Sequence, residues 1–488
     1  MDFGAVWPEI ILAGVGMLLV LLDPFVGAKR QRALGYLAVG GIVAAGIATL
    51  FEPRTGEVAL AGMVILDPLS LFFRLLFLSA ALLVTLFSFG FLQERDQDVG
   101  EFMALLCFAT TGAMVMAISW DIISLYVGLE LLSISSYILV AFLRDERRSH
   151  EAGLKYLLNG ALASALLLFG LSLIYGLTGT TAIPVLGRQL AAALGHPYGG
   201  IVWLAVGLVL AALAFKIAAA PFHLWAPDAY EGAPTPVTGY LMVVAESAGF
   251  AALIRLVSTG MGPLSTEWGI WLAGLAILTM TVGNVTALWQ QNIKRMLAYS
   301  SVAQVGYILA GIAVATRGGV GSTLFYLIAY LFSTLGCFAV IIALSARGHG
   351  EQIADYAGLG RRRPWLAGLL TLFFASYVGI PATAGFMGKL GLIGAAIHGD
   401  MAWLAVGIAV NSAISIGYYW SVARTMWIDP VPEAAGAIRA SAGGSISLVL
   451  SAVGVVLLGL VPQMFFHLAQ WIAETGDEFD LPDIHLPQ

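Results

Sequence analysis

Long apolar runs recur along almost the whole chain of 488 residues, and each is long enough to cross a lipid bilayer. A membrane-spanning helix needs roughly 20 predominantly apolar residues. Hydrophobic residues make up 59% of the sequence and charged residues only 11%, whereas ordinary globular chains carry about 25% charged residues. So few polar side chains cannot cover a water-exposed domain, which excludes soluble enzymes, nucleic-acid-binding proteins and disordered scaffolds.

The runs are too long and too uniformly apolar for the alternating strands of a membrane barrel. We therefore predict an all-α polytopic membrane protein with about 14 transmembrane helices. The expected spans are Pro8–Val26, Leu34–Leu50, Pro68–Leu92, Phe102–Ile118, Ile122–Leu143, Leu154–Leu177, Ile201–Phe222, Val237–Val257, Trp268–Trp289, Met296–Ala315, Thr323–Ser345, Trp365–Ile397, Trp403–Trp427 and Ile446–Phe466.

The lysines and arginines between these spans indicate an orientation, because inner loops of membrane proteins are enriched in both. With the N-terminus outside, the outer loops and helix ends hold only Arg54, Arg188, Arg255 and Arg317. An even number of spans then places the C-terminus, with its acidic tail, outside as well. The inner loops hold Lys29, Arg30, Arg32, Arg95, Arg144, Arg147, Arg148, Lys294, Arg295, Arg347, Arg361, Arg362, Arg363, Arg424 and Arg439.

Two of the spans are interrupted at their middle. The seventh contains FKIAAAPFHLWAPD with Pro221, and the twelfth contains YVGIPATAGFMGKL with Pro381. Proline removes a backbone donor, and irregular backbone at membrane depth survives only where protein buries it or where it lines a wet cavity. Matching broken helices in inverted repeats mark ion sites in transporters, although ordinary proline kinks are the alternative.

Both breaks fall in the fourth helix of a five-helix group, and five is odd, so the second group enters the membrane from the opposite side. We therefore predict two inverted five-helix repeats, each with a broken helix. The expected divisions are three N-terminal helices in residues 1–100, the repeats in 101–258 and 268–428, and a last helix with an acidic outer tail in 429–488.

Three lysines and two glutamates inside apolar spans are the main candidates, because a charge there costs about 2.5–3.5 kcal/mol and is by default a candidate functional site. Lysine changes its protonation readily when buried, and a facing carboxylate opposes that change. The hypothesis is a proton relay facing the bundle interior, with Glu130 and Lys216 as the first pair; buried ion pairs that hold helices together are the alternative. The five residues are Glu130, Lys155, Lys216, Glu246 and Lys389.

Other polar residues are weaker candidates. His223 follows the Pro221 break and either relays protons or caps freed carbonyls. Arg74 is expected to reach towards the outer interface and to be structural. Residues 180–196 are expected to form a short amphipathic segment on the outer surface.

Four stretches resemble the antiporter-like membrane subunits of respiratory complex I, most closely the subunit N group: LYVGLELLSISSYILVAF, EAGLKYLLNGALASALLLFG, FKIAAAPFHLWAPDAYEGAPTPVTGY and NIKRMLAYSSVAQVGYILAG. The resemblance implies a fourteen-helix fold and proton translocation driven by quinone reduction elsewhere. It places the family's essential glutamate on Glu130 and its lysines on Lys155, Lys216 and Lys389. Glu246 stands where the family usually carries a lysine.

The resemblance also implies a setting: a bacterial inner membrane, with both termini periplasmic and with the other membrane and peripheral subunits of the complex as partners beside the lipid bilayer. The chain has no cofactor-binding or nucleotide-binding motif, and Cys107 and Cys337 are too few for a metal cluster. It is therefore expected to be a non-redox subunit of a translocase that binds no cofactor and no nucleic acid. NADH, flavin, iron–sulfur clusters and quinone belong on its partners.

Three other functions stay open. One is a sodium/proton antiporter subunit of a multisubunit cation exchanger, whose family shares the broken helices. Another is a scaffold that pumps nothing and whose charges serve assembly. The third is a related complex that uses ferredoxin and plastoquinone.

Overall fold

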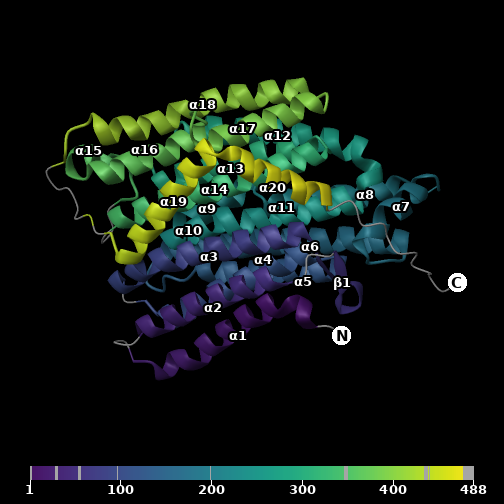
Figure 1. Cartoon of the computed structure of the whole chain (residues 1–488), viewed down its shortest axis with the longest axis horizontal. Helices are drawn as coiled ribbons and strands as arrows, with labels where there is room; N and C mark the ends of the chain where they lie inside the picture. Colours follow the sequence, from purple (N-terminus) through teal and green to yellow (C-terminus); the bar gives the residue numbers. More distant parts are fainter. Residues whose placement is uncertain are drawn as a thin grey trace.

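Helices account for nearly all of the chain. The computed structural model describes residues 3–27, 31–52, 56–95, 97–197, 199–345, 350–432, 438 and 440–475. Long helices lie side by side and run back and forth across one slab (Figure 1). Within the described residues, the only strands form a short antiparallel hairpin, β1 (Glu57–Ala59) and β2 (Val64–Leu66). The predicted all-α class is confirmed.

The helices follow one another with short connections. The first half contains α1 (Trp7–Leu22), α2 (Gln31–Phe51), α3 (Pro68–Glu94), α4 (Val99–Ile118), α5 (Ile122–Val140), α6 (Arg147–Thr178), α7 (Ile183–Leu194), α8 (Gly199–Lys216), α9 (Trp225–Gly232), α10 (Thr235–Tyr240) and α11 (Glu246–Ile254). The second half contains α12 (Ser265–Ala287), α13 (Ile293–Ala313), α14 (Arg317–Leu344), α15 (Leu359–Arg362), α16 (Pro364–Val378), α17 (Ala384–His398), α18 (Ala402–Trp427), α19 (Ala442–Leu460) and α20 (Pro462–Thr475).

The predicted spans agree with these helices. In the described part of the chain, 13 helical segments are long and apolar enough to cross a membrane. The one remaining predicted span, the twelfth (Trp365–Ile397), is split into α16 and α17, each too short alone. The last predicted span ends early, at Leu460, because Pro462 begins a new helix, α20. The expected amphipathic segment is α7.

A shared helix crossing supports the internal repeat. A Cβ added to Gly112 of α4 would lie 2.7 Å from the carbonyl oxygen of Gly128 on α5. A Cβ added to Gly283 of α12 would lie 2.7 Å from the carbonyl oxygen of Tyr299 on α13. Residues 112 and 128, like residues 283 and 299, are 16 apart, so the two helix pairs cross in the same register. The division into residues 101–258 and 268–428 stays a prediction.

The bundle has two ends, which differ in charge. The hairpin end carries the β1–β2 hairpin, α7 and the described ends of the first and last helices (Figure 1). Of the described arginines and lysines, Arg188, Arg255 and Arg317 lie at this end, and the loop residues predicted to be inner lie at the opposite end. Lys29, Arg30, Arg54, Arg347 and Arg439, like the acidic tail from residue 476 on, lie outside the described residues.

Candidate functional site

Lys216 is the last residue of α8, at the first helix break. The chain leaves the helix there because Ala218 adopts a left-handed conformation, with φ of 57°, and Pro221 follows. The Lys216 side chain is only 5% exposed. Its Nζ donates a hydrogen bond of 2.9 Å to the Ser133 hydroxyl of α5. The break therefore places a lysine in the interior with a neutral partner.

Glu130 lies one turn before Ser133 on α5, near Lys216 but with a different partner. The Glu130 carboxylate accepts a hydrogen bond from the Ser164 hydroxyl of α6. Ser133, Ser164 and Lys216 line one cavity of about 20 Å³ between α5, α6 and α8, which has room for about one water molecule. Within the described residues, Glu130 and Lys216 form no direct ion pair. Glu130 does not line this cavity, which we call the Lys216 cavity, and is connected to it through Ser164.

Glu246 is the most enclosed of the predicted site residues, with 1% of its surface exposed. It begins α11 directly after a π-helical turn, Leu241–Ala245. Its carboxylate accepts hydrogen bonds from the hydroxyls of Tyr230 at 2.8 Å, Ser301 at 2.5 Å and Tyr330 at 3.1 Å. No cationic side chain of the described residues forms an ion pair with it. A hydroxyl can donate or accept, so this set of partners accommodates either protonation state.

Lys389 of α17 lies against the second break. The break contains Gly379 and Ala382, both with positive φ, and Pro381. The Lys389 Nζ donates to the carbonyl oxygens of Tyr377 at 2.8 Å and Val378 at 3.1 Å, which end α16. Ending a helix at membrane depth leaves such carbonyls without partners and concentrates negative potential there. The break thus supplies the acceptors that hold a buried lysine.

The ring of Tyr307 completes the surroundings of Lys389, whose Nζ lies 4.3 Å from the ring centroid in a cation–π contact. The Tyr307 hydroxyl accepts a hydrogen bond of 2.9 Å from the Asn284 side chain. Between Lys389 and Glu246, Tyr377 donates to Thr334 at 2.7 Å. None of these tyrosines was predicted as a site residue, although each lies as a polar group within an apolar run.

Lys155 differs from the other candidates. Its side chain is 46% exposed and forms ion pairs with Glu151 at 2.8 Å and Asp228 at 3.1 Å. Asp228 in turn pairs with Arg295 at 3.0 Å. The expectation that Lys155 faces the bundle interior was therefore wrong, because α6 begins at Arg147, two turns earlier than predicted, and directs Lys155 to a charged cluster near the opposite end.

His223 lies in the 3-10 turn Phe222–Leu224 directly after Pro221 and is 7% exposed. Its ring stands 6.3 Å from that of Tyr299. Its Nδ1 has no hydrogen-bond partner within the described chain, but the ring has a hydrogen bond with the Pro221 backbone, so capping of a freed carbonyl remains open. A relay role for His223 stays a prediction.

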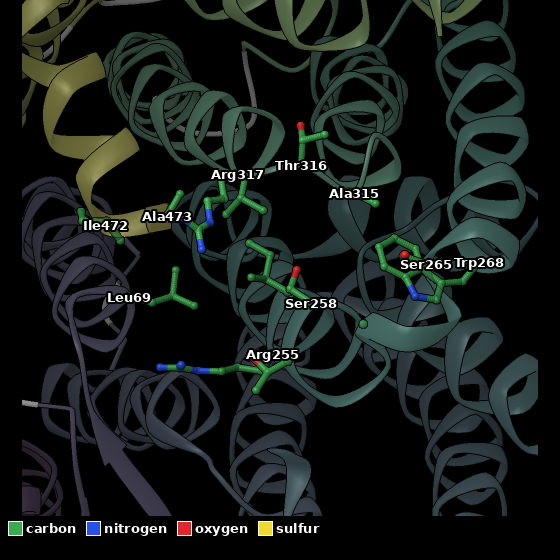
Figure 2. Close-up of a pocket in the computed structure, with 14 residues that line it drawn as sticks. Leu69, Arg255, Ser258, Ser265, Trp268, Ala315, Thr316, Arg317, Ile472 and Ala473 are labelled. Atoms are coloured by element: carbon green, nitrogen blue, oxygen red, sulfur yellow. The ribbon is translucent and has the colours of Figure 1, made fainter. Parts of the chain in front are cut away.

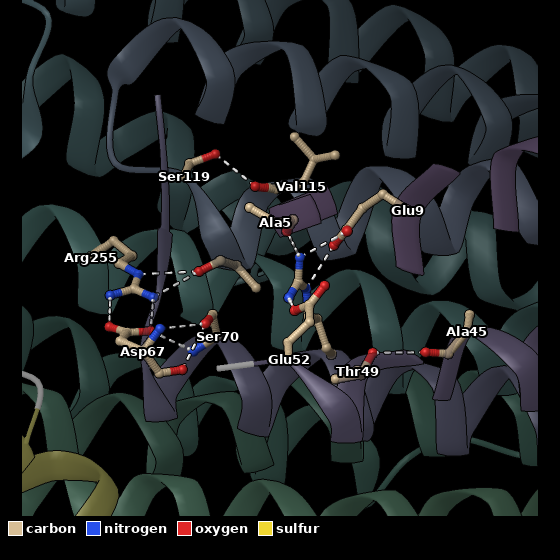
Figure 3. A network of polar contacts seen from close by, with 12 residues as sticks. Ala5, Glu9, Ala45, Thr49, Glu52, Asp67, Ser70, Val115, Ser119 and Arg255 are labelled. Carbon is tan, nitrogen blue, oxygen red and sulfur yellow. Dashed lines mark hydrogen bonds and ion pairs between the residues drawn. The ribbon is translucent and has the colours of Figure 1, made fainter. Parts of the chain in front are cut away.

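Two buried arginines at the hairpin end have carboxylate partners (Figure 3). The Arg255 guanidinium binds both oxygens of Asp67, at 2.5 and 2.6 Å. Arg74 binds Glu9 through two nitrogens, each at 2.8 Å, and also Glu52. The prediction that Arg74 reaches towards the interface was wrong, because its side chain is 1% exposed and fully engaged in the interior. Its structural role agrees with these contacts.

A larger pocket of about 300 Å³ also opens at the hairpin end (Figure 2). Ser258, Thr316 and Trp268 line it, and Ile472 and Ala473 of α20 close one side. Arg255 lines it too, but its guanidinium is bound to Asp67. None of the predicted relay residues contributes to this pocket, so its size does not make it the functional centre.

Fold and site together define a polytopic membrane protein of the antiporter-like class. Residues 119–415 match the family model described as NADH:quinone oxidoreductase/Mrp antiporter, transmembrane. The match covers both broken helices and all the predicted site residues.

Curated relatives are more specific. The chain is 42% identical to NADH-quinone oxidoreductase subunit N of Trichlorobacter lovleyi, covering 96% of each chain. It is 43% identical to subunit N of Heliobacterium modesticaldum, covering 97% of this chain and 100% of the relative. The chain belongs to the NADH-quinone oxidoreductase subunit N family.

Solved structures agree on the fold. A chain of respiratory complex I from Thermus thermophilus with bound aureothin superposes with a TM-score of 0.80 at 31% identity, covering 95% of this chain and 99% of that one. A chain of the Mrp complex from a Dietzia species superposes with a TM-score of 0.85 at 23% identity, covering 98% of each. At that identity, the second likeness concerns the fold alone.

Proposed function

We propose that this chain is the proton-translocating membrane subunit of a bacterial NADH-quinone oxidoreductase. Glu130, Lys216, Glu246 and Lys389 form its relay, and Lys155 lies at the mouth near the opposite end. One observation carries the proposal. Lys216, Glu246 and Lys389 are each at most 5% exposed, and each is held by neutral hydroxyls or carbonyls.

The chemistry follows from that environment. A buried charge with a fixed counter-ion keeps its protonation, because neutralising one partner leaves the other uncompensated. A buried group among neutral dipoles instead responds strongly to any nearby charge, since a unit charge at 4 Å is worth about 4 kcal/mol at an effective dielectric of 20. A proton arriving at one relay group therefore alters the affinity of the next group for its own proton.

The energy for this transfer comes from outside the chain. Moving one charge against the membrane potential costs about 2.3 kcal/mol per 100 mV. In this proposal the partner subunits carry NADH, flavin, iron–sulfur clusters and quinone, and conformational or electrostatic contacts transmit the energy. The family and the charge asymmetry favour a bacterial inner membrane with the hairpin end on the periplasmic side, the side predicted from the sequence for both termini.

The test replaces Lys216 in the assembled complex. In Lys216→Ala membranes we expect NADH-driven proton uptake to fall on the order of a hundredfold, the usual scale for a missing proton-transfer group. The content of the other subunits is expected to stay the same. The matched control is Lys294→Met: Lys294 is also buried, but it binds the Ala233 carbonyl at 2.6 Å and pairs with Glu351 at 3.8 Å, near the opposite end.

Two results would overturn the proposal. Normal proton uptake in Lys216→Ala membranes would show that Lys216 is not part of a proton relay. Reduced assembly with an unchanged proton-to-electron ratio would support the scaffold function instead.

The alternative is a sodium/proton antiporter subunit of a multisubunit exchanger, which the family description and the fold of the Mrp complex favour. Purification of the chain distinguishes the two functions. Co-purification with NADH-oxidising, iron–sulfur subunits supports the first function, and sodium/proton exchange without them supports the second.

A further inference from the structure

Tyr156 of α6 is a buried aromatic residue whose hydroxyl has no hydrogen-bond partner in the described chain. Its side chain is 2% exposed and its ring is fixed on both sides. The ring stacks on Trp225 with centroids 4.5 Å apart and meets Tyr137 edge-on at 4.7 Å. Because buried hydroxyls are nearly always satisfied by protein or ordered water, this one calls for a partner that the chain itself does not supply.

One side of Tyr156 faces the first relay pair. Tyr156 lines the Lys216 cavity, together with Ser133 and Ser164. Ser133 accepts from Lys216, and Ser164 donates to Glu130. The cavity has room for about one water molecule, and its polar lining gives that water several partners.

The other side of Tyr156 leads to Glu246. Trp225, on which Tyr156 stacks, also meets Tyr230 at 5.6 Å, and Tyr230 donates to Glu246.

Close packing holds these two sites together. One turn after Glu246, Gly249 faces the stem of Lys216: a Cβ there would lie 3.3 Å from Lys216 Cγ and 2.5 Å from Ile217 Cγ2. The helix that carries Glu246 therefore packs directly against Lys216 and Ile217.

We propose that the Tyr156 hydroxyl, with a water molecule in the Lys216 cavity, transfers protons between Lys216 and Glu246. The Lys216 ammonium gives a proton to the water, which passes a proton to the Tyr156 oxygen. A further water carries the Tyr156 O–H proton to the Tyr230 oxygen as the Tyr230 O–H proton moves to the Glu246 carboxylate, to which Tyr230 donates at 2.8 Å. Lys216 ends neutral and Glu246 ends protonated, while both tyrosines and both waters regain their protons. The hydroxyl can do this because it both donates and accepts.

The inference rests on the proposed function, and Tyr156→Phe tests it. Phenylalanine keeps the stack on Trp225 and removes only the hydroxyl. In the assembled complex we expect NADH-driven proton uptake to fall on the order of a hundredfold, with unchanged subunit content and unchanged NADH oxidation by a soluble artificial acceptor. The control is Tyr356→Phe, which removes an equally buried hydroxyl that donates to the Gly350 carbonyl at 3.0 Å in a loop at the opposite end.

Comparison with Lys216→Ala separates the two proposals. If Lys216→Ala stops proton uptake and Tyr156→Phe retains the wild-type rate and proton-to-electron ratio, the transfer through Tyr156 is wrong and the relay stands. If both variants pump normally, the transfer through Tyr156 and the proposed relay function are both wrong. If Tyr156→Phe lowers the subunit content, Tyr156→Trp, which retains the ring stack and offers a donor but no acceptor, is expected to assemble without pumping. Pumping by that variant would also overturn the inference.

Discussion

The buried charges at the hairpin end and those at the centre of the bundle differ in the partners that hold them. Arg255 and Arg74 each bind carboxylates through several hydrogen bonds (Figure 3). Lys216, Glu246 and Lys389 are as deeply buried, yet their hydrogen bonds go to hydroxyls and carbonyls. Burial alone therefore does not distinguish a structural charge from a candidate relay group.

The difference indicates what each region can do. An arginine bound by a carboxylate stays charged at any ordinary pH and joins helices that are far apart in sequence, as Arg255 and Asp67 do. A lysine or glutamate among neutral dipoles is the group whose protonation a neighbour can change. The arginine–carboxylate pairs at the hairpin end stabilise the fold. The lysines and the glutamate at the centre can change their protonation when a nearby charge changes.

The largest effect on stability is expected from Asp67→Asn. The substitution leaves Arg255 buried without its counter-ion, which costs about 3–5 kcal/mol. Thermal unfolding of the detergent-solubilised complex and the amount of the chain in membranes measure it. The control Asp98→Asn alters a pair with Arg144 that is 43% and 66% exposed and 3.6 Å long, and is expected to change little. Equal behaviour of the two variants would remove the distinction between the regions.

For Glu246→Gln we expect little change in stability but a large loss of proton uptake. Glutamine has nearly the same shape and still accepts from Tyr230, Ser301 and Tyr330, so unfolding of the complex should change by about 1 kcal/mol or less. Glutamine carries no titratable proton, and NADH-driven proton uptake should fall on the order of a hundredfold. A variant that unfolds easily but still pumps would show that Glu246 is structural.

The pH dependence of stability also tests the role of the Asp67–Arg255 pair. Burial alone would raise the pKa of Asp67, but attraction to Arg255 and its hydrogen bonds hold that pKa below its usual value. A lowered pKa contributes stability that is present above about pH 4 and is lost as the pH falls through the folded-state value. We expect the thermal stability of the wild-type complex to decline below about pH 4, and Asp67→Asn to remove part of that decline. An identical pH profile in the variant would contradict the assignment to Asp67.

The smallest effect on stability is expected from Lys155→Ala, because its ion pairs are half-exposed and such pairs contribute about 0.2–1 kcal/mol. Proton uptake is expected to fall less than in Lys216→Ala, since water can reach the charged cluster around Lys155. If the two variants lose proton uptake equally, Lys155 belongs to the relay itself rather than to its mouth.

Parts of the site were predictable from the sequence and parts were not. Lys216, Glu246 and Lys389 were identified as buried charges because a charge inside an apolar run is visible in one dimension. The exposure of Lys155 was missed, because the sequence places it only one residue inside an apolar run and does not say which face of α6 is covered. Tyr156, its neighbour, points inward from the same helix and was missed for the same reason.

What the sequence determined by itself is the membrane class, the number of spans and the positions of both breaks. A bilayer requires about 20 apolar residues for each crossing, and proline and glycine act on the backbone next to them. Only the tertiary structure decided which charges are compensated. The partners of Glu246 come from residues 230, 301 and 330 and those of Lys389 from the end of another helix, and helix rotation and packing, which join distant segments, bring them together.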